Sequence, residues 1–308
     1  MNVKEKMYDR IRGVLYGVAV GDCLGAPAEF RDQAEIAARF GEIRDIVPGS
    51  VIGARLGCGT DDTAMTLAVA EGIMKCKPGE NPVRQIGAEF VRWFCGEPIG
   101  LGGTCGRAIE FASKYGRVKS PSLKAWAAAS EMTHYQLRGR SGGNGTLMRT
   151  APIALLYTDD AERDNVAYGV SKMTHWDEDA ATACVLYCEI ISKLIQGQKL
   201  EDAVSCLKES KDYNETVTDP QPTGYVKDTF KTALWGWFEH NSFESILINV
   251  VNLGGDADTT GAIVGGLAGA EFGYSAIPDR WIEALDGKLK TRLDAAAEAA
   301  GKVWGCGT

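Results

Sequence analysis

The sequence of 308 residues has no excess of basic charge and no long apolar run. Its formal net charge is −8, with 33 basic and 41 acidic residues. This balance argues against broad binding to nucleic acid or to a membrane surface, because both need a basic face. The longest apolar stretches, such as residues 262–270, are too short and too rich in glycine to span a bilayer. Residues 1–12 are charged and have none of the apolar core of a secretory signal.

Paired cysteine motifs are also missing. The nine cysteines are an odd number, and no two form a Cys-x-x-Cys pair. Cys184 and Cys188 share one face of a predicted helix, but no second pair offers zinc-binding spacing. We therefore expect reduced, mostly buried thiols and a cytoplasmic protein. The Walker A, His-Glu-x-x-His and Gly-x-Ser-x-Gly motifs are absent too, so three common signatures of hydrolases give no support here.

Helical periodicity dominates the chain, whereas strand patterns are few and short, with residues 43–47 as the best candidate. Helices are predicted over residues 8–19, 64–74, 83–94, 123–132, 179–194, 225–238, 243–249, 259–272 and 280–303. Residues 212–223, which contain two prolines, are predicted to form a surface loop between helices. No low-complexity linker or fixed repeat interrupts the pattern. We expect an all-α fold in which residues 1–308 form a single domain.

The predicted helix over residues 259–272 has an unusual face. Gly261, Gly265 and Gly269 recur at every fourth position. Each glycine costs a helix interior roughly 1 kcal/mol relative to alanine. Three on one face indicate that another helix approaches closely there, so this helix is expected to be central and buried.

Two acidic clusters stand at predicted helix starts: Gly-Thr-Asp-Asp-Thr at residues 59–63 and Gly-Gly-Asp-Ala-Asp-Thr-Thr at residues 254–260. Asp and Thr commonly cap free N–H groups at such positions. Capping needs one such residue, however, whereas each cluster places two carboxylates and a hydroxyl in apolar, Gly-rich sequence, where unpaired charge is costly to bury. If folding brings the clusters together, four carboxylates need cations between them. Oxygen ligands of this kind suit Mg²⁺ or Mn²⁺.

An EF-hand is the competing interpretation of the second cluster. Asp256, Asp258 and Gly261 match positions 1, 3 and 6 of that calcium-binding loop. Position 12 requires a bidentate Glu but is Leu267, and the segment is predicted to be helical before that point. We therefore reject the EF-hand interpretation.

Three further segments place polar residues in turns. Residues 21–30 end the first predicted helix and present Asp22 and Glu29. Residues 141–149 form a Gly-rich turn whose N–H groups suit a phosphate, although a plain helix–helix connection explains a bare turn of this kind equally well. His175, one of three histidines, precedes a helix, and a lone histidine is more often structural than functional.

Taken together, these segments resemble the ADP-ribosylglycohydrolase family, which includes the dinitrogenase reductase-activating glycohydrolases and the ADP-ribosyl-acceptor hydrolases. The matching motifs are Gly-Asp-x-Leu-Gly-x-Pro-x-Glu at residues 21–29, Gly-Thr-Asp-Asp-Thr at 59–63, Gly-Asn-Gly-Thr-x-Met-Arg-x-Ala-Pro at 143–152, Thr-His at 174–175 and Gly-Gly-Asp-x-Asp-Thr at 254–259. They cover nearly the whole chain. The two acidic motifs are highly specific in combination, and the others add order and spacing.

The resemblance implies a compact orthogonal helical bundle with two Mg²⁺ or Mn²⁺ ions in a cleft. The family's metal ligands fall on Thr60, Asp61, Asp62, Asp256, Asp258 and Thr259. Its glycine-rich segment near the substrate phosphates corresponds to Ser141, Gly142, Gly143, Asn144 and Gly145, and its residue on the ribose and adenine side corresponds to His175. Glu29 matches a mobile carboxylate near the metals, and Glu29, Asp61 and Asp62 are the predicted catalytic residues.

The activity implied is hydrolysis at the anomeric carbon of the distal ribose, which releases ADP-ribose from a protein side chain, arginine or serine, or from a small ADP-ribosyl conjugate. A non-catalytic ADP-ribose-binding protein of the same fold and a metal-dependent phosphohydrolase are the alternatives. The resemblance leaves open the acceptor linkage, the choice between Mg²⁺ and Mn²⁺ and the oligomeric state.

One stretch departs from the family pattern. Arginine-specific bacterial members carry an Asp-Ile-Gly turn with the Asp near the scissile bond. The corresponding stretch here is residues 100–104, so that Gly100 replaces the Asp. Glu97 lies three residues earlier and is a candidate substitute for the missing carboxylate. Because this Asp is missing, the resemblance alone establishes neither arginine specificity nor activity for this sequence.

Overall fold

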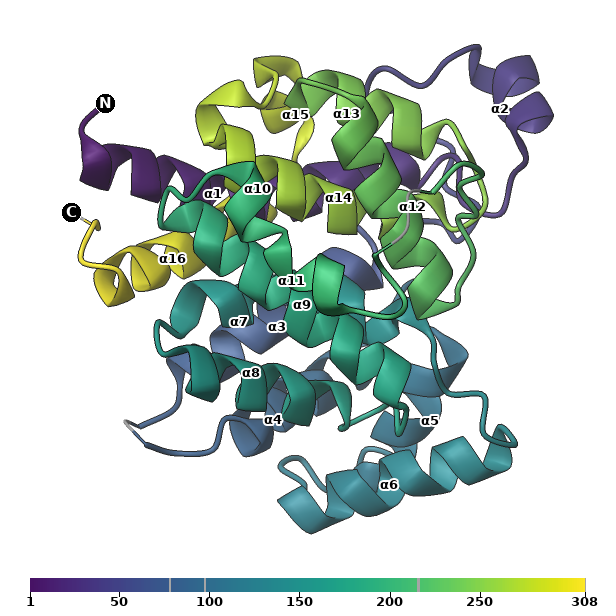
Figure 1. Ribbon diagram of the computed structural model, residues 1–308. Coiled ribbons are helices and arrows are strands. Elements are labelled where there is room, and N and C mark those ends of the chain that lie inside the picture. The colour runs from purple at the N-terminus through teal and green to yellow at the C-terminus, as the bar shows by residue number, and fades with distance from the viewer. Residues whose placement is uncertain (78, 97, 215–216, 308) are drawn as a thin grey trace.

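The computed structural model describes residues 1–77, 79–96, 98–214 and 217–307 (Figure 1). These residues form sixteen α-helices, two 3₁₀ helices and no strand, which confirms the all-α fold class. In chain order the helices are α1 (Val3–Gly25), α2 (Gln33–Phe40), α3 (Asp61–Met74), α4 (Val83–Phe94), α5 (Gly103–Ala112), α6 (Leu123–Gln136), η1 (Asn144–Arg149), α7 (Ala151–Leu156), α8 (Asp160–Ser171), α9 (Glu178–Ile195), α10 (Leu200–Ala203), α11 (Ser205–Glu209), α12 (Val226–Glu239), α13 (Phe243–Val251), α14 (Ala257–Phe272), η2 (Tyr274–Ala276), α15 (Asp279–Ala284) and α16 (Gly287–Val303).

One of the predicted helices is wrong. The single helix expected over residues 280–303 is two helices, α15 and α16, because the chain is extended at Leu285 and Asp286 then caps α16. Residues 43–47, the best of the few strand candidates, form an irregular segment. The N–H and carbonyl groups of Ile43 are both bonded to the Asn252 side chain, so a side-chain amide takes the place of a neighbouring strand.

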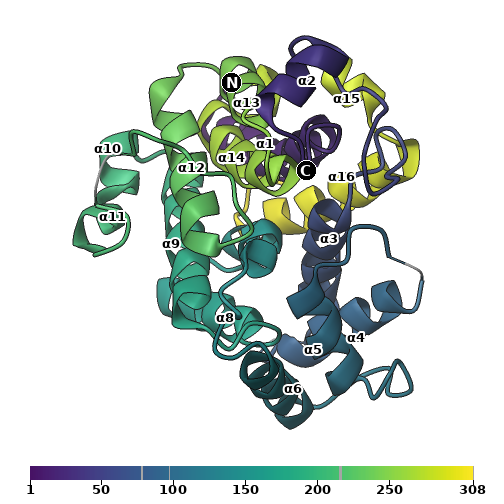
Figure 2. The same cartoon turned by 90° about the vertical axis from the view of Figure 1, so that its right-hand side faces the viewer.

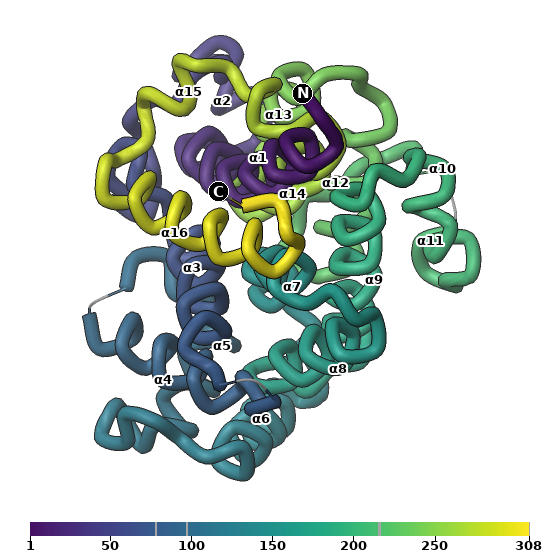
Figure 3. Tube along the Cα trace, turned by 90° about the vertical axis from the view of Figure 1, so that its left-hand side faces the viewer, coloured from purple at the N-terminus to yellow at the C-terminus, as the bar shows by residue number. Residues whose placement is uncertain are grey.

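The centre of the molecule is the antiparallel pair of α1 and α14, which lie side by side in Figures 1 and 3. The contact is made by glycines that recur every fourth residue on both helices: Gly13, Gly17 and Gly21 face Gly269, Gly265 and Gly261. A Cβ atom at Gly17 would lie 2.1 Å from the carbonyl oxygen of Gly265. Only glycine therefore lets the two backbones touch. The predicted close approach to this face of α14 is confirmed, and α14 is buried along nearly its whole length.

The glycine contacts place three helix ends together. Because α1 and α14 are antiparallel, the end of α1 that carries Asp22 lies beside the start of α14, where Asp258 stands. The start of α3 reaches the same point, since the N–H groups of Thr60 and Thr63 both donate to the Asp22 carboxylate. The long-range packing of one helix pair thus assembles acidic residues from distant parts of the sequence.

Helices α5 and α6 form one end of the molecule, at the bottom of Figure 1 and Figure 2. We call residues 103–140 the α5–α6 lobe. Both of its ends adjoin the region where the acidic residues meet, because α5 follows the turn at Gly100 and the residue after the lobe is Ser141. None of the helices in the described residues has the length and apolar character needed to cross a membrane.

All nine cysteines are free thiols, in agreement with the expected reduced state. Cys184 and Cys188 are both buried on α9, on the face that packs against Thr150. Four of the nine thiols are buried, four are partly buried and Cys95 is exposed, so the expectation of mostly buried thiols is wrong.

Candidate metal and substrate site

The structure brings the two acidic clusters together where α1, α3 and α14 meet. One carboxylate oxygen from each of Asp22, Asp62 and Asp258 lies within 4.8 Å of the other two. All three side chains are buried. The Thr259 hydroxyl lies 3.5 Å from Oδ2 of Asp62, so the two predicted clusters are in direct contact. This spacing suits a cation with carboxylate ligands.

Asp22 was singled out in the sequence but was assigned no role in the predicted site. Its side chain is fully buried, and Oδ2 accepts hydrogen bonds from the N–H of Thr60 at 2.9 Å, from the N–H of Thr63 at 3.1 Å and from the Thr63 hydroxyl. A residue of α1 therefore satisfies N–H groups at the start of α3 that would otherwise be free. The available signal was its position next to Gly21, on the glycine-bearing stretch of α1.

The first cluster caps α3 and also contains a buried carboxylate oxygen that capping does not use. Thr60 does cap α3, since its hydroxyl accepts the N–H of Asp62, and the same hydroxyl lies 3.0 Å from Oδ2 of Asp62. Oδ1 of Asp62 is buried and has no hydrogen-bond partner among the described residues. Capping therefore accounts for Thr60 and leaves a buried carboxylate oxygen unexplained.

Asp61 lies against the turn in which the sequence departs from the family pattern. A Cβ atom at Gly100 would stand 2.4 Å from Oδ1 of Asp61, and Gly100 has a φ of +82°. A hydrogen bond from the backbone of Gly102 also favours the charged form of the Asp61 carboxylate. Residue 100 is consequently a direct neighbour of the acidic cluster. Glu97, the candidate substitute for the missing carboxylate, lies outside the described residues.

The second cluster is held by the glycine-rich turn rather than by capping. Asp256 precedes α14 without a side-chain cap, and its Oδ2 instead accepts a hydrogen bond from the Asn144 amide at 2.7 Å. The same amide donates to the Thr229 hydroxyl at 3.0 Å. Asn144 was predicted to bind substrate, but its side chain is directed at Asp256. It links the predicted phosphate-binding segment to the acidic cluster.

Glu29 completes the acidic group. It is 6% exposed, and its Oε2 has no hydrogen-bond partner among the described residues. Burial, followed by the neighbouring Asp256 charge, raises the pKa of Glu29 to about 7. The next residue, Phe30, is 68% exposed and has a φ of +59°, a conformation that is unusual for a bulky side chain.

The acidic group has no internal countercharge. Burial, and secondarily the neighbouring carboxylates, raise the pKa values of Asp61, Asp62 and Asp258 well above the usual range. No Lys, Arg or His of the described segments forms an ion pair with any of these carboxylates. Buried like charges of this number need positive charge from elsewhere. The donor set and the unpartnered oxygens therefore fit bound divalent cations.

The glycine-rich turn packs directly against three side chains from other segments. A Cβ atom would stand 3.1 Å from the Asp177 carboxylate at Gly142, 3.1 Å from Nε2 of His175 at Gly143, and 2.9 Å from Sγ of Cys105 at Gly145. Ser141 is buried, and its hydroxyl lies 2.6 Å from Nδ1 of His134. The N–H of Asn144 donates to the carbonyl oxygen of Gly224 at 3.1 Å, so this one group of the predicted phosphate-binding segment is already in use.

His175 is buried beneath the turn as a neutral ring. Its Nδ1 lies 2.8 Å from the Thr174 hydroxyl, which itself accepts a hydrogen bond from Arg149 at 2.8 Å. A neutral imidazole carries one ring hydrogen, and its Nε2 faces Gly143. Burial, followed by the Arg149 charge, lowers the pKa of His175 to about 3.

Arg149 is a fully buried cation that stands just below the glycine-rich turn. Its Nη1 donates to the carbonyl oxygen of Gly145 at 3.0 Å, and its guanidinium carbon lies 4.7 Å from the centre of the Phe90 ring. No carboxylate among the described residues pairs with it. A positive charge without a partner below a glycine-rich turn favours an anion above it.

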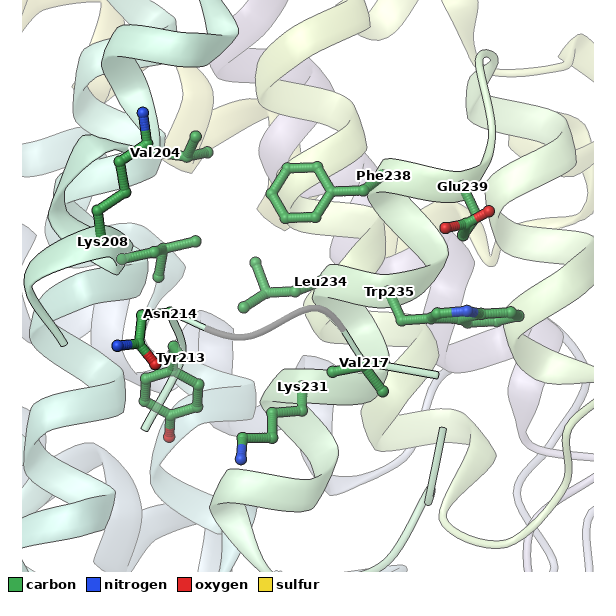
Figure 4. A pocket seen from close by; sticks show the side chains of 11 residues that line it. Val204, Lys208, Tyr213, Asn214, Val217, Lys231, Leu234, Trp235, Phe238 and Glu239 are labelled. Atoms are coloured by element: carbon green, nitrogen blue, oxygen red, sulfur yellow. The ribbon is translucent and has the colours of Figure 1, made fainter. Parts of the chain in front are cut away.

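A separate cavity of about 330 Å³ lies between α11 and α12 (Figure 4). Its lining is largely apolar and aromatic, with Leu207, Tyr213, Leu234, Trp235 and Phe238. It contains none of the acidic residues or the glycine-rich turn. The helix ends therefore remain the candidate site.

The sequence profile of the ADP-ribosylglycohydrolase family matches residues 3–306. The chain belongs to this family. The ADP-ribosyl-[dinitrogen reductase] glycohydrolase of Rhodospirillum rubrum is 33% identical over 95% of this chain and 96% of its own length. The ADP-ribosylarginine hydrolase Tri1 of Serratia proteamaculans is 28% identical over 90% of this chain and 75% of its length. The resemblance inferred from the motifs is confirmed.

More distant relatives and a solved structure agree with the assignment. The ADP-ribosylhydrolase ARH3 of Bos taurus is 23% identical over 96% of this chain and 93% of its own length. A solved structure described as an ADP-ribosylglycohydrolase-related protein complex superposes with a TM-score of 0.76 and 28% identity, covering 97% of this chain and 99% of that one. The ADP-ribosylglycohydrolase fold thus accounts for the whole described chain.

Proposed function

We propose that this family member is a metal-dependent hydrolase that removes ADP-ribose from a modified acceptor by cleaving the bond at the anomeric carbon of the distal ribose. The observation that carries the proposal is the group of buried carboxylates without internal countercharge, placed next to a glycine-rich turn with a buried cation below it. The names of the relatives, which act on ADP-ribosylated dinitrogen reductase and on ADP-ribosylarginine, support the same reaction.

Two divalent cations, Mg²⁺ or Mn²⁺, belong to this proposal. The residues that would hold them are Thr60, Asp61, Asp62, Asp256, Asp258 and Thr259. Their carboxylate and hydroxyl oxygens are the ligands that hard cations prefer, and the unpartnered oxygen of Asp62 is free to act in this way. Bound at this position, the cations would supply Lewis-acid chemistry, orienting ribose hydroxyls and lowering the pKa of a water molecule.

The protein's own carboxylates supply the proton transfers. Glycosidic cleavage commonly uses two carboxylates on either side of an oxocarbenium-like transition state. Glu29 has a buried oxygen without a partner and lies beside Asp256 and Asp258, so we assign it the leaving-group proton. Asp61 or Asp62 is assigned the proton of the attacking water.

The phosphates of the substrate are assigned to the segment from Ser141 to Gly145. Nε2 of His175 faces this turn, and the buried charge of Arg149 lies below it. These groups provide local anion binding in a protein whose net charge is −8. Asn144 contributes by holding Asp256, which ties the position of the phosphate-binding turn to that of the metal ligands.

The acceptor side is assigned to the turn at Gly100, because this turn contacts Asp61 at the edge of the acidic group. Acceptors of the arginine-linked, serine-linked and small-conjugate classes are all compatible with a residue that has no side chain. The product in each case is free ADP-ribose.

The proposal is tested with a panel of ADP-ribosylated peptides and small conjugates, each assayed with Mg²⁺, with Mn²⁺ and with a chelator. The substitutions Asp61→Asn and Asp256→Asn should each lower metal-dependent release of ADP-ribose by about 100-fold or more, because each removes a charged ligand. Asp45→Asn, which changes a surface carboxylate paired with Arg280, is the matched control and should keep full activity. Full activity in both ligand variants would overturn the two-metal assignment.

A binding measurement and the identity of the released product separate the alternative functions. Tight ADP-ribose binding by calorimetry without turnover of any conjugate would identify a non-catalytic binder. Release of AMP instead of ADP-ribose would identify a phosphohydrolase.

A further inference from the structure

The α5–α6 lobe differs from the rest of the protein in charge. Residues 103–140 contain seven basic and two acidic residues, whereas the remainder of the chain contains 26 basic and 39 acidic residues. The basic residues are Arg107, Lys114, Arg117, Lys119, Lys124, Arg138 and Arg140. A protein with a net charge of −8 therefore has one strongly positive segment.

The positive charge of the lobe is directed at solvent. All seven basic side chains are exposed, and none of them forms an ion pair within the described residues. Elsewhere many arginines are neutralised internally, as Arg163 is by Asp160 and Asp164 and as Arg280 is by Asp45. Unneutralised charge of one sign on a surface attracts and orients a partner of opposite sign.

The lobe adjoins the candidate site at both of its ends. Its first helix follows the turn at Gly100 that contacts Asp61, and Arg107 lies one turn into that helix. Its last residue, Arg140, directly precedes Ser141 of the phosphate-binding turn. A macromolecule that presents an ADP-ribosyl group at these two turns would have the lobe directly beside it.

Exposed apolar side chains accompany these charges. Leu123 is 49% exposed, Met132 is 50% exposed and Tyr135 is 79% exposed, all on α6, and Tyr115 in the α5–α6 connection is 67% exposed. Tyr, Met and Arg are the residue types that are enriched in protein–protein interfaces. The lobe thus combines charge with side chains that are suited to a protein surface.

We propose that the α5–α6 lobe is the docking surface for the protein that carries the ADP-ribosyl group, and that this protein is acidic around the modified side chain. The inference rests on the proposed function, because that function provides the reason for a protein acceptor to approach. A protein patch fits better than a nucleic acid, since the lobe's excess of five positive charges is local and the rest of the chain, with 13 more acidic than basic residues, repels a long polyanion.

The test uses three ADP-ribosylated peptides with the same modified residue, flanked by four Glu, four Gln or four Lys residues. For each, kcat/KM is measured with metal, and Kd is measured by fluorescence anisotropy in a chelator. We expect kcat/KM for the Glu-flanked peptide to exceed that for the Gln-flanked peptide by about tenfold at low salt, with the Lys-flanked peptide lowest. The ratio should approach one at about 1 M salt, where the screening length is near 3 Å.

The variants locate the effect. The triple substitution of Arg107, Arg138 and Arg140 by Gln should abolish the preference for the Glu-flanked peptide and leave turnover of the Gln-flanked peptide unchanged. The control triple substitution of Lys4, Lys288 and Lys302 by Gln changes the net charge equally at exposed positions on α1 and α16, and should keep the preference. Thermal melting confirms that both variants are folded.

The outcomes are distinct. Equal kcat/KM and Kd for the three peptides, or a preference that survives the lobe substitutions, overturns the docking inference. If no peptide is hydrolysed but Kd shows the preference and the lobe variant loses it, the proposed hydrolase function fails while the docking inference stands. If a single-stranded 12-nucleotide DNA competes for binding more strongly than a 12-residue polyglutamate peptide, nucleic acid replaces the acidic protein as the partner.

Discussion

Glycine makes two different kinds of contact in this protein. Between α1 and α14, glycines such as Gly17 and Gly265 bring backbone against backbone in the core. In the candidate site, Gly100 and Gly143 bring backbone against side chains of the predicted site, those of Asp61 and His175. The first set joins the central helices, and the second set places polar groups. A residue without a side chain thus serves the scaffold in one region and the chemistry in the other.

The two regions are also linked in space. The glycine-spaced face of α1 continues to Gly25, whose missing Cβ leaves room for the carbonyl oxygen of Ala257 at the start of α14. Asp22 and Glu29 lie at this end of α1 and just beyond it. The packing of α1 against α14 therefore places the residues of the acidic group beside one another. Substitutions should separate the glycines that join the central helices from those that place polar groups in the candidate site.

The largest effect on stability is expected where the backbones of α1 and α14 touch. In Gly265→Ala, the new Cβ would lie 2.1 Å from the carbonyl oxygen of Gly17, so the helices must move apart, and the free energy of unfolding should fall by about 3 kcal/mol or more. The matched control is Gly169→Ala on α8, where the new Cβ meets nothing within 4 Å and stability should rise by about 0.5–1 kcal/mol. Urea unfolding measures both. A similar result for the two variants would contradict the scaffold role.

A large effect on activity with a small effect on stability is expected at the acceptor turn. Gly100 and Gly53 both have a φ of +82°, so alanine costs about 1–2 kcal/mol of stability at either position. Only at Gly100 does the new Cβ meet a functional group, at 2.4 Å from Oδ1 of Asp61. Gly100→Ala should therefore lower kcat/KM by about 10- to 100-fold, whereas Gly53→Ala should leave it unchanged. Equal kcat/KM values for the two variants would show that the turn at Gly100 is not part of the site.

A smaller effect is expected in the phosphate-binding turn. In Gly143→Ala, the new Cβ lies 3.1 Å from Nε2 of His175, which is tight but tolerable. We expect KM for an ADP-ribosyl substrate to rise by about tenfold, because the methyl group covers Nε2 of His175, and the melting temperature to change little. Gly103→Ala, which has open space around it, is the control. An unchanged KM would argue against phosphate binding at this turn.

The smallest effect concerns the pH dependence of stability. Because the pKa of His175 is lowered to about 3 in the folded state, the unfolded chain binds more protons at this residue between pH 3 and about 6.5. Stability should therefore fall as the pH drops through this window, by up to about 1.4 kcal/mol per pH unit from this group, and be unaffected by it above pH 7. Between pH 7.5 and 5.5 His175→Asn should show a shallower decline in urea unfolding. An identical slope would contradict the buried neutral histidine.

Much of the helical structure was predictable from local pattern. Helix α4 was predicted with both ends correct, because one face is apolar and Pro82 precedes it. Helix α5 was missed, since it begins with Gly103, has no side-chain cap and is supported by packing against α6. The break before α16 was missed because a distant contact makes it: the N–H of Asp286 donates to the carbonyl oxygen of Gly57. A contact between residues so far apart in the sequence leaves no local pattern from which it could be predicted.

The candidate site was predictable to a similar degree. The two acidic clusters, Glu29, the glycine-rich turn and His175 were all identified from their motifs, and the structure places them around the same helix ends. The role of Asp22 was not, because its partners, the N–H groups of Thr60 and Thr63, are backbone groups brought near by folding. The direction of the Asn144 side chain was missed because its partner, Oδ2 of Asp256, is 112 residues away in the sequence and is brought near by folding.

By itself the sequence determined the all-α class, the family and the residue types that meet at the site, because these depend on periodicity and on short motifs. Only the tertiary structure decided that Asp61 lies against Gly100, that Arg149 is buried below the phosphate-binding turn and that the α5–α6 lobe gathers exposed positive charge beside the site. Proximity, burial and the absence of a countercharge depend on which segments of the chain pack against one another. They arise when the glycine-spaced faces of α1 and α14 bring distant segments into contact.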